Sequence, residues 1–129
     1  LASRLAKLSG LYPQKRSTDC TRHSYHLFML RFDAREFGRP REEVYKALQT
    51  EGIPCSTGYG FSLPQQPFFR NRAFGPYLPN AAVNYSKVRC PNSDRICREA
   101  IWFRQSMFLG PRSDMDDIAR AFEKVLANS

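Results

Sequence analysis

The sequence has no hydrophobic run long enough to cross a membrane. A spanning helix needs about 18 consecutive apolar residues, and the 129-residue chain contains no such stretch. Its first residues also lack the apolar core of a signal peptide. With 42% hydrophobic and 25% charged residues, the composition is that of a globular domain, and wholesale disorder is excluded. We therefore expect a single folded domain over residues 1–129, with no membrane partner.

Only two histidines are present, and the spacing of the four cysteines limits the metal and redox chemistry of the chain. Four cysteines would allow two disulfides, but a chain with this many core-forming residues needs no covalent staples. Zinc sites favour CxxC-type pairs, whereas six residues separate Cys90 from Cys97. His23 and His26 lie an odd number of residues apart, so on a strand they face opposite sides and share no ligand. We predict no metal site and four reduced, mostly buried thiols in a cytoplasmic protein: Cys20, Cys55, Cys90 and Cys97.

Familiar signatures of catalysis and nucleotide binding are also missing. There is no GxSxG nucleophile motif and no P-loop, and the glycines form no dinucleotide-binding fingerprint. The acidic cluster of Asp114, Asp116 and Asp117 suits the N-terminus of a helix, where negative charge meets the positive end of the dipole. The residues alone therefore offer no catalytic constellation.

Acidic residues are fewer than basic ones, 12 against 20, which gives a net charge of +8. Residues 1–64 and residues 65–129 each carry ten basic and six acidic side chains. Such an even surplus favours a solvated surface over a dedicated nucleic-acid stripe, and we expect no nucleic-acid partner. Arginine outnumbers lysine fifteen to five, however, and arginine with aromatics is how single strands are bound. A basic nucleic-acid-binding module stays open as an alternative, and it predicts an affinity that falls steeply with salt.

Hydrophobic runs predict three strands. Residues 25–32 are apolar on both faces, which is typical of a central strand. Residues 53–57 are expected to form a short second strand, and residues 100–109 contain a third. Residues 11–22 are mostly polar and predict a connection, and residues 33–39 predict a turn.

Periodic apolar residues predict the helices that flank these strands. Residues 40–52 form one helix, with Pro40 at its first position and Gly52 as its left-handed stop. Residues 91–98 form a second, short helix. In the last helix Ser113 is the N-cap of a capping box completed by Asp116. The apolar face of that helix consists of Met115, Ile118, Ala119, Phe122, Val125 and Leu126.

The first residues also have helical spacing, with Leu1, Leu5 and Leu8 at i, i+4 and i+7. No capping residue precedes them. We therefore expect residues 1–10 to be the end of an interdomain helix and the sequence to start inside a larger protein. Together the elements predict an α+β fold, with a small sheet of about three strands and helices packed mainly on one face.

Residues 58–79 form an aromatic segment without helical or strand periodicity. Three glycines and four prolines accompany six rings, and loops this long are uncommon in compact domains unless they are functional. The rings either cover the core of this domain or line a surface shared with another. They are Tyr59, Phe61, Phe68, Phe69, Phe74 and Tyr77. Gly58-Tyr59-Gly60 by itself indicates a close backbone approach or a turn with positive φ.

Five motifs follow one another in a distinctive order: HSYHLFMLRFD, RPREEVYKALQTEGIP, CSTGYGFSLPQQPFF, RCPNSDRICREAIWF and DMDDIARAFEKVL. This succession closely resembles the C-terminal domain of the DegT/StrS family of pyridoxal-phosphate-dependent sugar aminotransferases. The resemblance covers essentially the whole chain. It implies the small domain of a fold-type-I enzyme, whose large N-terminal cofactor domain carries pyridoxal phosphate and the Schiff-base lysine. None of the five lysines here lies in the family's lysine motif, so this fragment is expected to bind no cofactor and to be inactive alone.

The resemblance also implies a substrate site. The small domain of such enzymes closes over the cofactor cleft and helps to shape the acceptor pocket, and the matching positions here are Gly58, Tyr59 and Gln66. Tyr59 combines an apolar ring with a polar tip that suits a sugar, or else Tyr59 and Phe61 only fill the domain interface. Many family members carry His or Tyr at the place of Pro64. Since proline donates no hydrogen bond, that contact is absent here or supplied elsewhere.

The function implied for the full protein is amino transfer from glutamate or glutamine to a keto sugar or cyclitol. The reaction would be ping-pong, with pyridoxamine phosphate as the carrier, in a cytoplasmic homodimer. The CSTGY form of the loop favours cyclitol ketones or related antibiotic precursors. The alternative from another class is a non-catalytic regulatory or binding module that kept the fold, as Pro64 hints. That alternative predicts that no cofactor domain precedes Leu1 in the gene.

Overall fold

The structure is a computed structural model that describes residues 1–75 and 84–128. It divides into two compact units. Unit 1 comprises Leu1–Gly58 and Glu99–Ser129, and unit 2 comprises Tyr59–Arg98. Tyr77, one of the six rings of the aromatic segment, lies outside the described residues. Within the described part, no helix has the length and apolar character that crossing a membrane requires.

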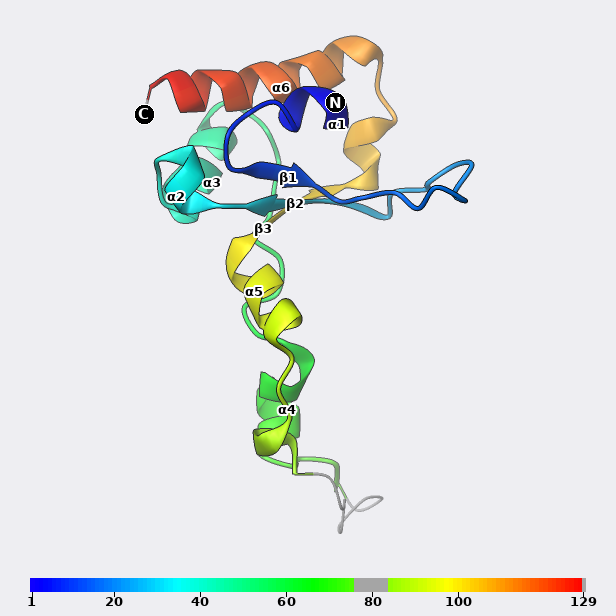
Figure 1. The fold of residues 1–129 in the computed structure, drawn as a ribbon, viewed down its shortest axis with the longest axis vertical. Helices are drawn as coiled ribbons and strands as arrows, with labels where there is room; N and C mark the ends of the chain where they lie inside the picture. Colours follow the sequence, from blue (N-terminus) through cyan, green and yellow to red (C-terminus); the bar gives the residue numbers. More distant parts are fainter. Residues whose placement is uncertain (76–83, 129) are drawn as a thin grey trace. The chain divides into compact units, whose positions relative to one another are not determined.

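Unit 1 is built on a three-stranded antiparallel sheet (Figure 1). Its strands are β1 (Leu11–Pro13), β2 (Leu27–Phe32) and β3 (Ala100–Arg104), in the order β1-β2-β3. The prediction of a central strand over residues 25–32 is confirmed, because β2 pairs with both of its neighbours. Side chains of β2 alternate between buried and half-buried along the strand, as the pleat of a sheet requires.

Three strands are present as predicted, but one of them is a different segment. β1 lies in the stretch expected to be a connection. It has only three residues and ends in proline, which is too short for the alternation of apolar and polar residues that predicts a strand. Residues 53–57 form only an isolated bridge, in which Ser56 and Trp102 exchange backbone hydrogen bonds of 2.9 and 2.7 Å. The third strand lies within residues 100–109 as predicted, and it ends where the chain turns into the 3-10 helix η4 (Gln105–Phe108).

In unit 1 the positions of the longer helices agree with the predictions better than their capping residues do. Helix α3 (Arg41–Thr50) stops before Gly52, whose φ of 78° confirms the left-handed stop. Helix α6 (Arg112–Ala127) has Pro111 as its N-cap, so Ser113 lies inside the helix and its predicted capping role is wrong. Two one-turn helices complete the unit: α1 (Ala2–Leu5) and, at the predicted turn, α2 (Ala34–Phe37).

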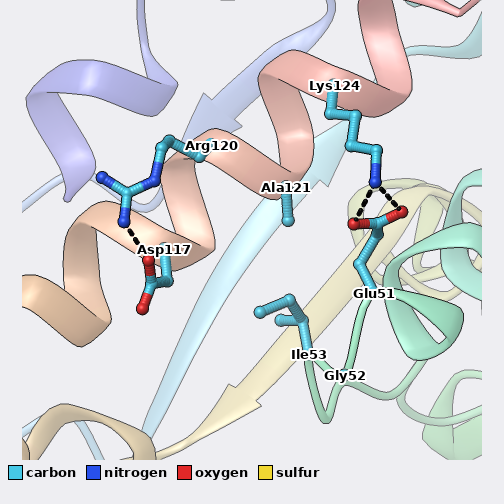
Figure 2. Close-up of a pocket in the computed structure, with 7 residues that line it drawn as sticks. All are labelled: Glu51, Gly52, Ile53, Asp117, Arg120, Ala121 and Lys124. Carbon is cyan, nitrogen blue, oxygen red and sulfur yellow. Dashed lines mark hydrogen bonds and ion pairs between the residues drawn. The ribbon is translucent and has the colours of Figure 1, made fainter.

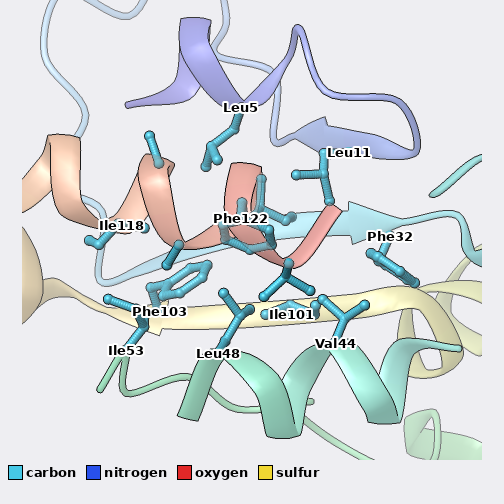
Figure 3. Packing of buried hydrophobic residues seen from close by; sticks show 14 of the residues in the cluster. Leu5, Leu11, Phe32, Val44, Leu48, Ile53, Ile101, Phe103, Ile118 and Phe122 are labelled. Carbon is cyan, nitrogen blue, oxygen red and sulfur yellow. The ribbon is translucent and has the colours of Figure 1, made fainter. Parts of the chain in front are cut away.

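The core of unit 1 lies between the sheet and its helices (Figure 3). In Figure 1, α1 and α6 lie over the same face of the sheet, which agrees with helices packed mainly on one face. The predicted apolar face of α6 is largely correct: Ile118, Ala119, Phe122 and Val125 are buried, whereas Met115 and Leu126 pack against the core from half-buried positions. Burial of each large apolar side chain contributes about 1.5–3 kcal/mol. The largest fully buried side chains are Phe32, Phe37, Phe103, Phe122, Leu5, Leu30, Leu48, Ile101 and Val44.

The described part of unit 2 consists of short helical pieces. They are η1 (Leu63–Gln65), α4 (Pro67–Arg70), η3 (Tyr85–Lys87) and α5 (Pro91–Glu99), whose last residue belongs to unit 1. The short helix expected at residues 91–98 is confirmed by α5. The aromatic segment is less irregular than expected, since η1 and α4 lie within it. Three of its rings, Phe68, Phe69 and Phe74, meet one another and the ring of Tyr85 in η3 at centroid distances of 5.0–6.0 Å.

All four cysteines are free thiols. Each is half-buried, so the expectation of mostly buried thiols overstated their burial.

Candidate functional site

Gly58, the first residue that the resemblance marks as a site position, is held tightly against β3. Its φ of 72° is left-handed, and its N–H donates a 3.1 Å hydrogen bond to the Ser56 hydroxyl. A Cβ at this position would lie 2.5 Å from Cε2 of the Trp102 ring. Positive φ and close approach both require glycine here. The backbone of Gly58 is therefore held in one conformation against the edge of the sheet.

Tyr59 opens unit 2 with a side chain that is 68% exposed. Phe61, two residues on, is 55% exposed. A tyrosine in such a position presents a flat apolar ring and a hydroxyl that donates and accepts hydrogen bonds. This combination suits a polyhydroxylated ring, which has apolar C–H faces and a polar rim.

Gln66, the third predicted site residue, is the N-cap residue of α4. Its side-chain Nε2 donates a 3.0 Å hydrogen bond to the carbonyl oxygen of Phe61. The structure thus brings Gln66 back to the segment that follows Tyr59, within unit 2. Gly58 belongs to the other unit and is joined to Tyr59 by the chain itself.

A polar triad of Ser62, Gln65 and Asp94 lies beside these residues, and no pattern in the sequence predicted it. The Ser62 hydroxyl donates a hydrogen bond to Asp94 Oδ1, and Nε2 of Gln65 donates a 2.9 Å bond to the same oxygen. Ser62 is only 5% exposed, and it is the one buried polar residue of the part of the chain that the structure describes. Asp94 lies 32 residues further along, on α5, and no local pattern links two such distant positions.

A charged cluster surrounds Arg31 on the sheet of unit 1. Its guanidinium lies 3.7 Å above the centre of the Tyr12 ring and reaches Glu99 at 3.2 Å and Asp33 at 3.5 Å. Burial tends to raise the pKa of Asp33, but hydrogen bonds from the backbone N–H groups of Arg35 and Glu36 and from Arg31 outweigh it, so that pKa lies below its ordinary value. All these groups satisfy one another, and the cluster fastens β2 to its neighbours.

A pocket of about 410 Å³ lies between the end of α3 and the exposed side of α6 (Figure 2). Its charged residues pair with each other: Lys124 with Glu51 at 2.7 Å, and Arg120 with Asp117. Exposed pairs of this kind contribute little to stability, about 0–1 kcal/mol. The pocket brings together no nucleophile and base.

Neither a metal nor pyridoxal phosphate fits the described residues. Among them, no three His, Cys, Asp or Glu side chains gather where a metal ion would sit. A lysine that attacks a carbonyl is activated by desolvation or by neighbouring cations. The five lysines here are all exposed, and Lys124 is engaged with Glu51. These side chains do not match an attachment point for the cofactor.

The fold of this chain has a counterpart in part of a longer protein of known structure. It matches the crystal structure of 3-amino-5-hydroxybenzoic acid (AHBA) synthase with a TM-score of 0.71 over 99% of this chain and 32% of that one, at 20% identity. The model of the DegT/DnrJ/EryC1/StrS aminotransferase family matches residues 1–123, and the chain belongs to this family. The resemblance found in the five motifs is thereby confirmed.

Two curated relatives carry the same name, L-glutamine:2-deoxy-scyllo-inosose aminotransferase. The protein from Streptoalloteichus tenebrarius is 30% identical over 137 residues, and the one from Streptomyces kanamyceticus is 32% identical over 124 residues. The alignments cover 98% and 91% of this chain. They cover only 31% and 29% of the relatives, so the chain spans about three-tenths of their length.

Proposed function

We propose that this chain is the C-terminal domain of a pyridoxal-phosphate-dependent aminotransferase that transfers an amino group from glutamine to a keto cyclitol. One observation carries the proposal: nearly the whole chain aligns at 30% identity with a glutamine:2-deoxy-scyllo-inosose aminotransferase. Glutamate as the donor and a keto sugar as the acceptor are the nearest variants of the same chemistry.

The cofactor would be held by a domain outside this chain, because the lysines described here do not fit its attachment. When bound, pyridoxal phosphate supplies the electron sink for amino transfer. This chain on its own is then inactive, and its partners are its own N-terminal cofactor domain and a second copy of the full protein in a cytoplasmic homodimer.

The part proposed for this chain is to bind and orient the acceptor. Gly58 fixes the exit from the sheet, and Tyr59 follows it with an exposed ring that can stack on the C–H face of a cyclitol. Gln66, tied to the Phe61 carbonyl, lies at the other end of the same segment. Pro64 donates no hydrogen bond, so the acceptor hydroxyls must find their donors at other positions.

The test is an assay of the full-length protein with glutamine and 2-deoxy-scyllo-inosose, with the amino product detected by mass spectrometry. In a Tyr59→Ala variant we expect the KM for the keto cyclitol to rise about tenfold, because a stacking ring contributes about 1–1.5 kcal/mol. The matched control is Phe61→Ala, which removes a neighbouring exposed ring.

If both variants lose stability equally and leave the KM for the acceptor unchanged, the rings serve the domain interface and the substrate role of Tyr59 is refuted. A full-length protein that has no cofactor lysine and no activity with any keto cyclitol or keto sugar would support the non-catalytic module instead.

A further inference from the structure

We propose that Asp94 is a positioning residue for the acceptor substrate. Its carboxylate holds η1 in place, and through η1 it sets the position of Gln66 and of the Phe61 carbonyl to which Gln66 is bonded. The inference rests on the proposed function and adds to it a residue that does not touch the substrate.

The geometry of the triad is the first support. A single oxygen of Asp94 accepts hydrogen bonds from both Ser62 and Gln65, which are the residue before η1 and its last residue. Hydrogen bonds to a charged carboxylate are roughly twice as strong as neutral ones. Ser62 is 95% buried, so loss of its acceptor would leave a buried hydroxyl unsatisfied.

The second support is the way the triad continues into the site. The Gln65 N–H donates to the Ser62 carbonyl at 2.9 Å, and the Gln66 N–H donates to Leu63 at 3.1 Å. Nε2 of the Gln66 side chain in turn donates a 3.0 Å hydrogen bond to the Phe61 carbonyl oxygen. A displacement of η1 therefore moves Gln66 directly and moves Phe61 with it.

Charge supplies a third argument. Asp94 is the only acidic residue in the sequence of unit 2, against six basic ones. Its carboxylate accepts hydrogen bonds from two neutral side chains, Ser62 and Gln65. An exposed acidic residue in that setting would serve solubility or pair with a nearby cation. Asp94 instead satisfies a buried serine and a glutamine next to the predicted site residue. Misplacement of a binding group by about 1 Å can lower a rate about a hundredfold, so such a tie has consequences for catalysis.

The experiment compares the two substrates of the full-length enzyme. In a ping-pong reaction, kcat/KM for each substrate reports only on its own half of the cycle. For Asp94→Ala we expect kcat/KM for 2-deoxy-scyllo-inosose to fall about ten- to a hundredfold, while kcat/KM for glutamine stays within about twofold. Asn92→Ala is the matched control, an exposed residue of the same helix, and should change neither constant.

Two further variants separate positioning from simple loss of folding. Asp94→Asn keeps an acceptor oxygen and should recover most of the acceptor constant. Ser62→Ala should reproduce part of the Asp94→Ala effect, and the double variant should be no worse than Asp94→Ala alone, because both changes remove one interaction. In Asp94→Ala, hydrogen exchange at the backbone amides of Gln65 and Gln66 should become faster.

Equal falls in both constants, or additive effects of the two substitutions, would refute the positioning role and leave Asp94 as a residue of general stability. Faster exchange with an unchanged acceptor constant would also refute it. A wild-type protein that converts no keto cyclitol or keto sugar with glutamine or glutamate would instead refute the proposed function, and with it a role for Asp94 in that reaction.

Discussion

Unit 1 and unit 2 differ in the interactions that stabilise each of them internally. All seventeen buried hydrophobic residues found in the described part of the chain belong to unit 1, whereas unit 2 buries only the polar Ser62 to the same degree. Of the seven exposed large hydrophobic residues described, five lie in unit 2: Tyr59, Phe61, Leu63, Phe68 and Val88. A segment of about 40 residues can bury too little surface for a core of its own. Unit 1 is therefore stabilised by a hydrophobic core, whereas unit 2 is stabilised by contacts between aromatic rings and by hydrogen bonds of polar side chains.

The two units also differ in charge. Unit 2 has six basic residues and one acidic residue, while unit 1 has fourteen and eleven. Division of the sequence at its midpoint concealed this, because each half mixes residues of both units. Basic and exposed aromatic side chains thus occur in the same unit as Tyr59 and Gln66. Exposed apolar groups in such number mark a surface that meets a ligand or another domain.

The largest expected effect tests whether only unit 1 has a core. Phe122→Ala removes a fully buried ring and should lower the free energy of unfolding by about 3–5 kcal/mol. Phe69→Ala removes a half-buried ring of unit 2 and should lower it by about 1 kcal/mol, the size of an aromatic pair contribution. Urea denaturation measures both. Equal decreases in the free energy of unfolding for the two variants would contradict the conclusion that only unit 1 has a hydrophobic core.

A smaller effect is expected where the chain passes from one unit to the other. Gly58→Ala forces a side chain into a left-handed position against the Trp102 ring and should cost about 1–3 kcal/mol. Gly60→Ala is the matched control: it is two residues further on, and a Cβ there meets nothing within 4 Å. Thermal unfolding of the two variants compares them, and a neutral Gly58→Ala would show that the exit from the sheet is not fixed.

The smallest effect concerns the chemistry of a thiol in unit 1. Burial raises the pKa of Cys55 to about 11. Only about one Cys55 thiol in a thousand is then ionised at pH 8, so alkylation by iodoacetamide should be slow and should speed up until about pH 11. In a short peptide of the same sequence the rate should level off near pH 9. Peptide mapping by mass spectrometry follows both, and matching profiles would show that the native thiol is not shielded.

The same ionisation affects stability at alkaline pH. Since the pKa of Cys55 is raised in the folded state, the contribution of the buried neutral thiol to the free energy of unfolding is complete at a pH below the pKa that Cys55 has in the unfolded state. It is lost as the pH rises through about 11.

Local patterns in the sequence determined the parts of the fold that depend on neighbours along the chain. The apolar spacing of α6, the alternation and central position of β2 and the left-handed stop at Gly52 each follow from a few consecutive residues, and each was predictable. The order of five motifs likewise determined the family. The cap of α6 was missed because Pro111 and Ser113 both suit a helix start, and the choice between them depends on where the chain arrives from β3.

Tertiary structure alone decided which distant segments meet. Residues 11–13 became a strand because β2 offered them an edge. Residues 53–57 meet the free edge of β3 only through Ser56 and Trp102, and two residues later the backbone turns at Gly58 with a left-handed φ of 72°. The tie from Asp94 to Ser62 joins positions 32 residues apart, across a segment with no period. A sequence records which faces of its elements prefer burial, but contacts between remote positions exist only once the chain has closed on itself.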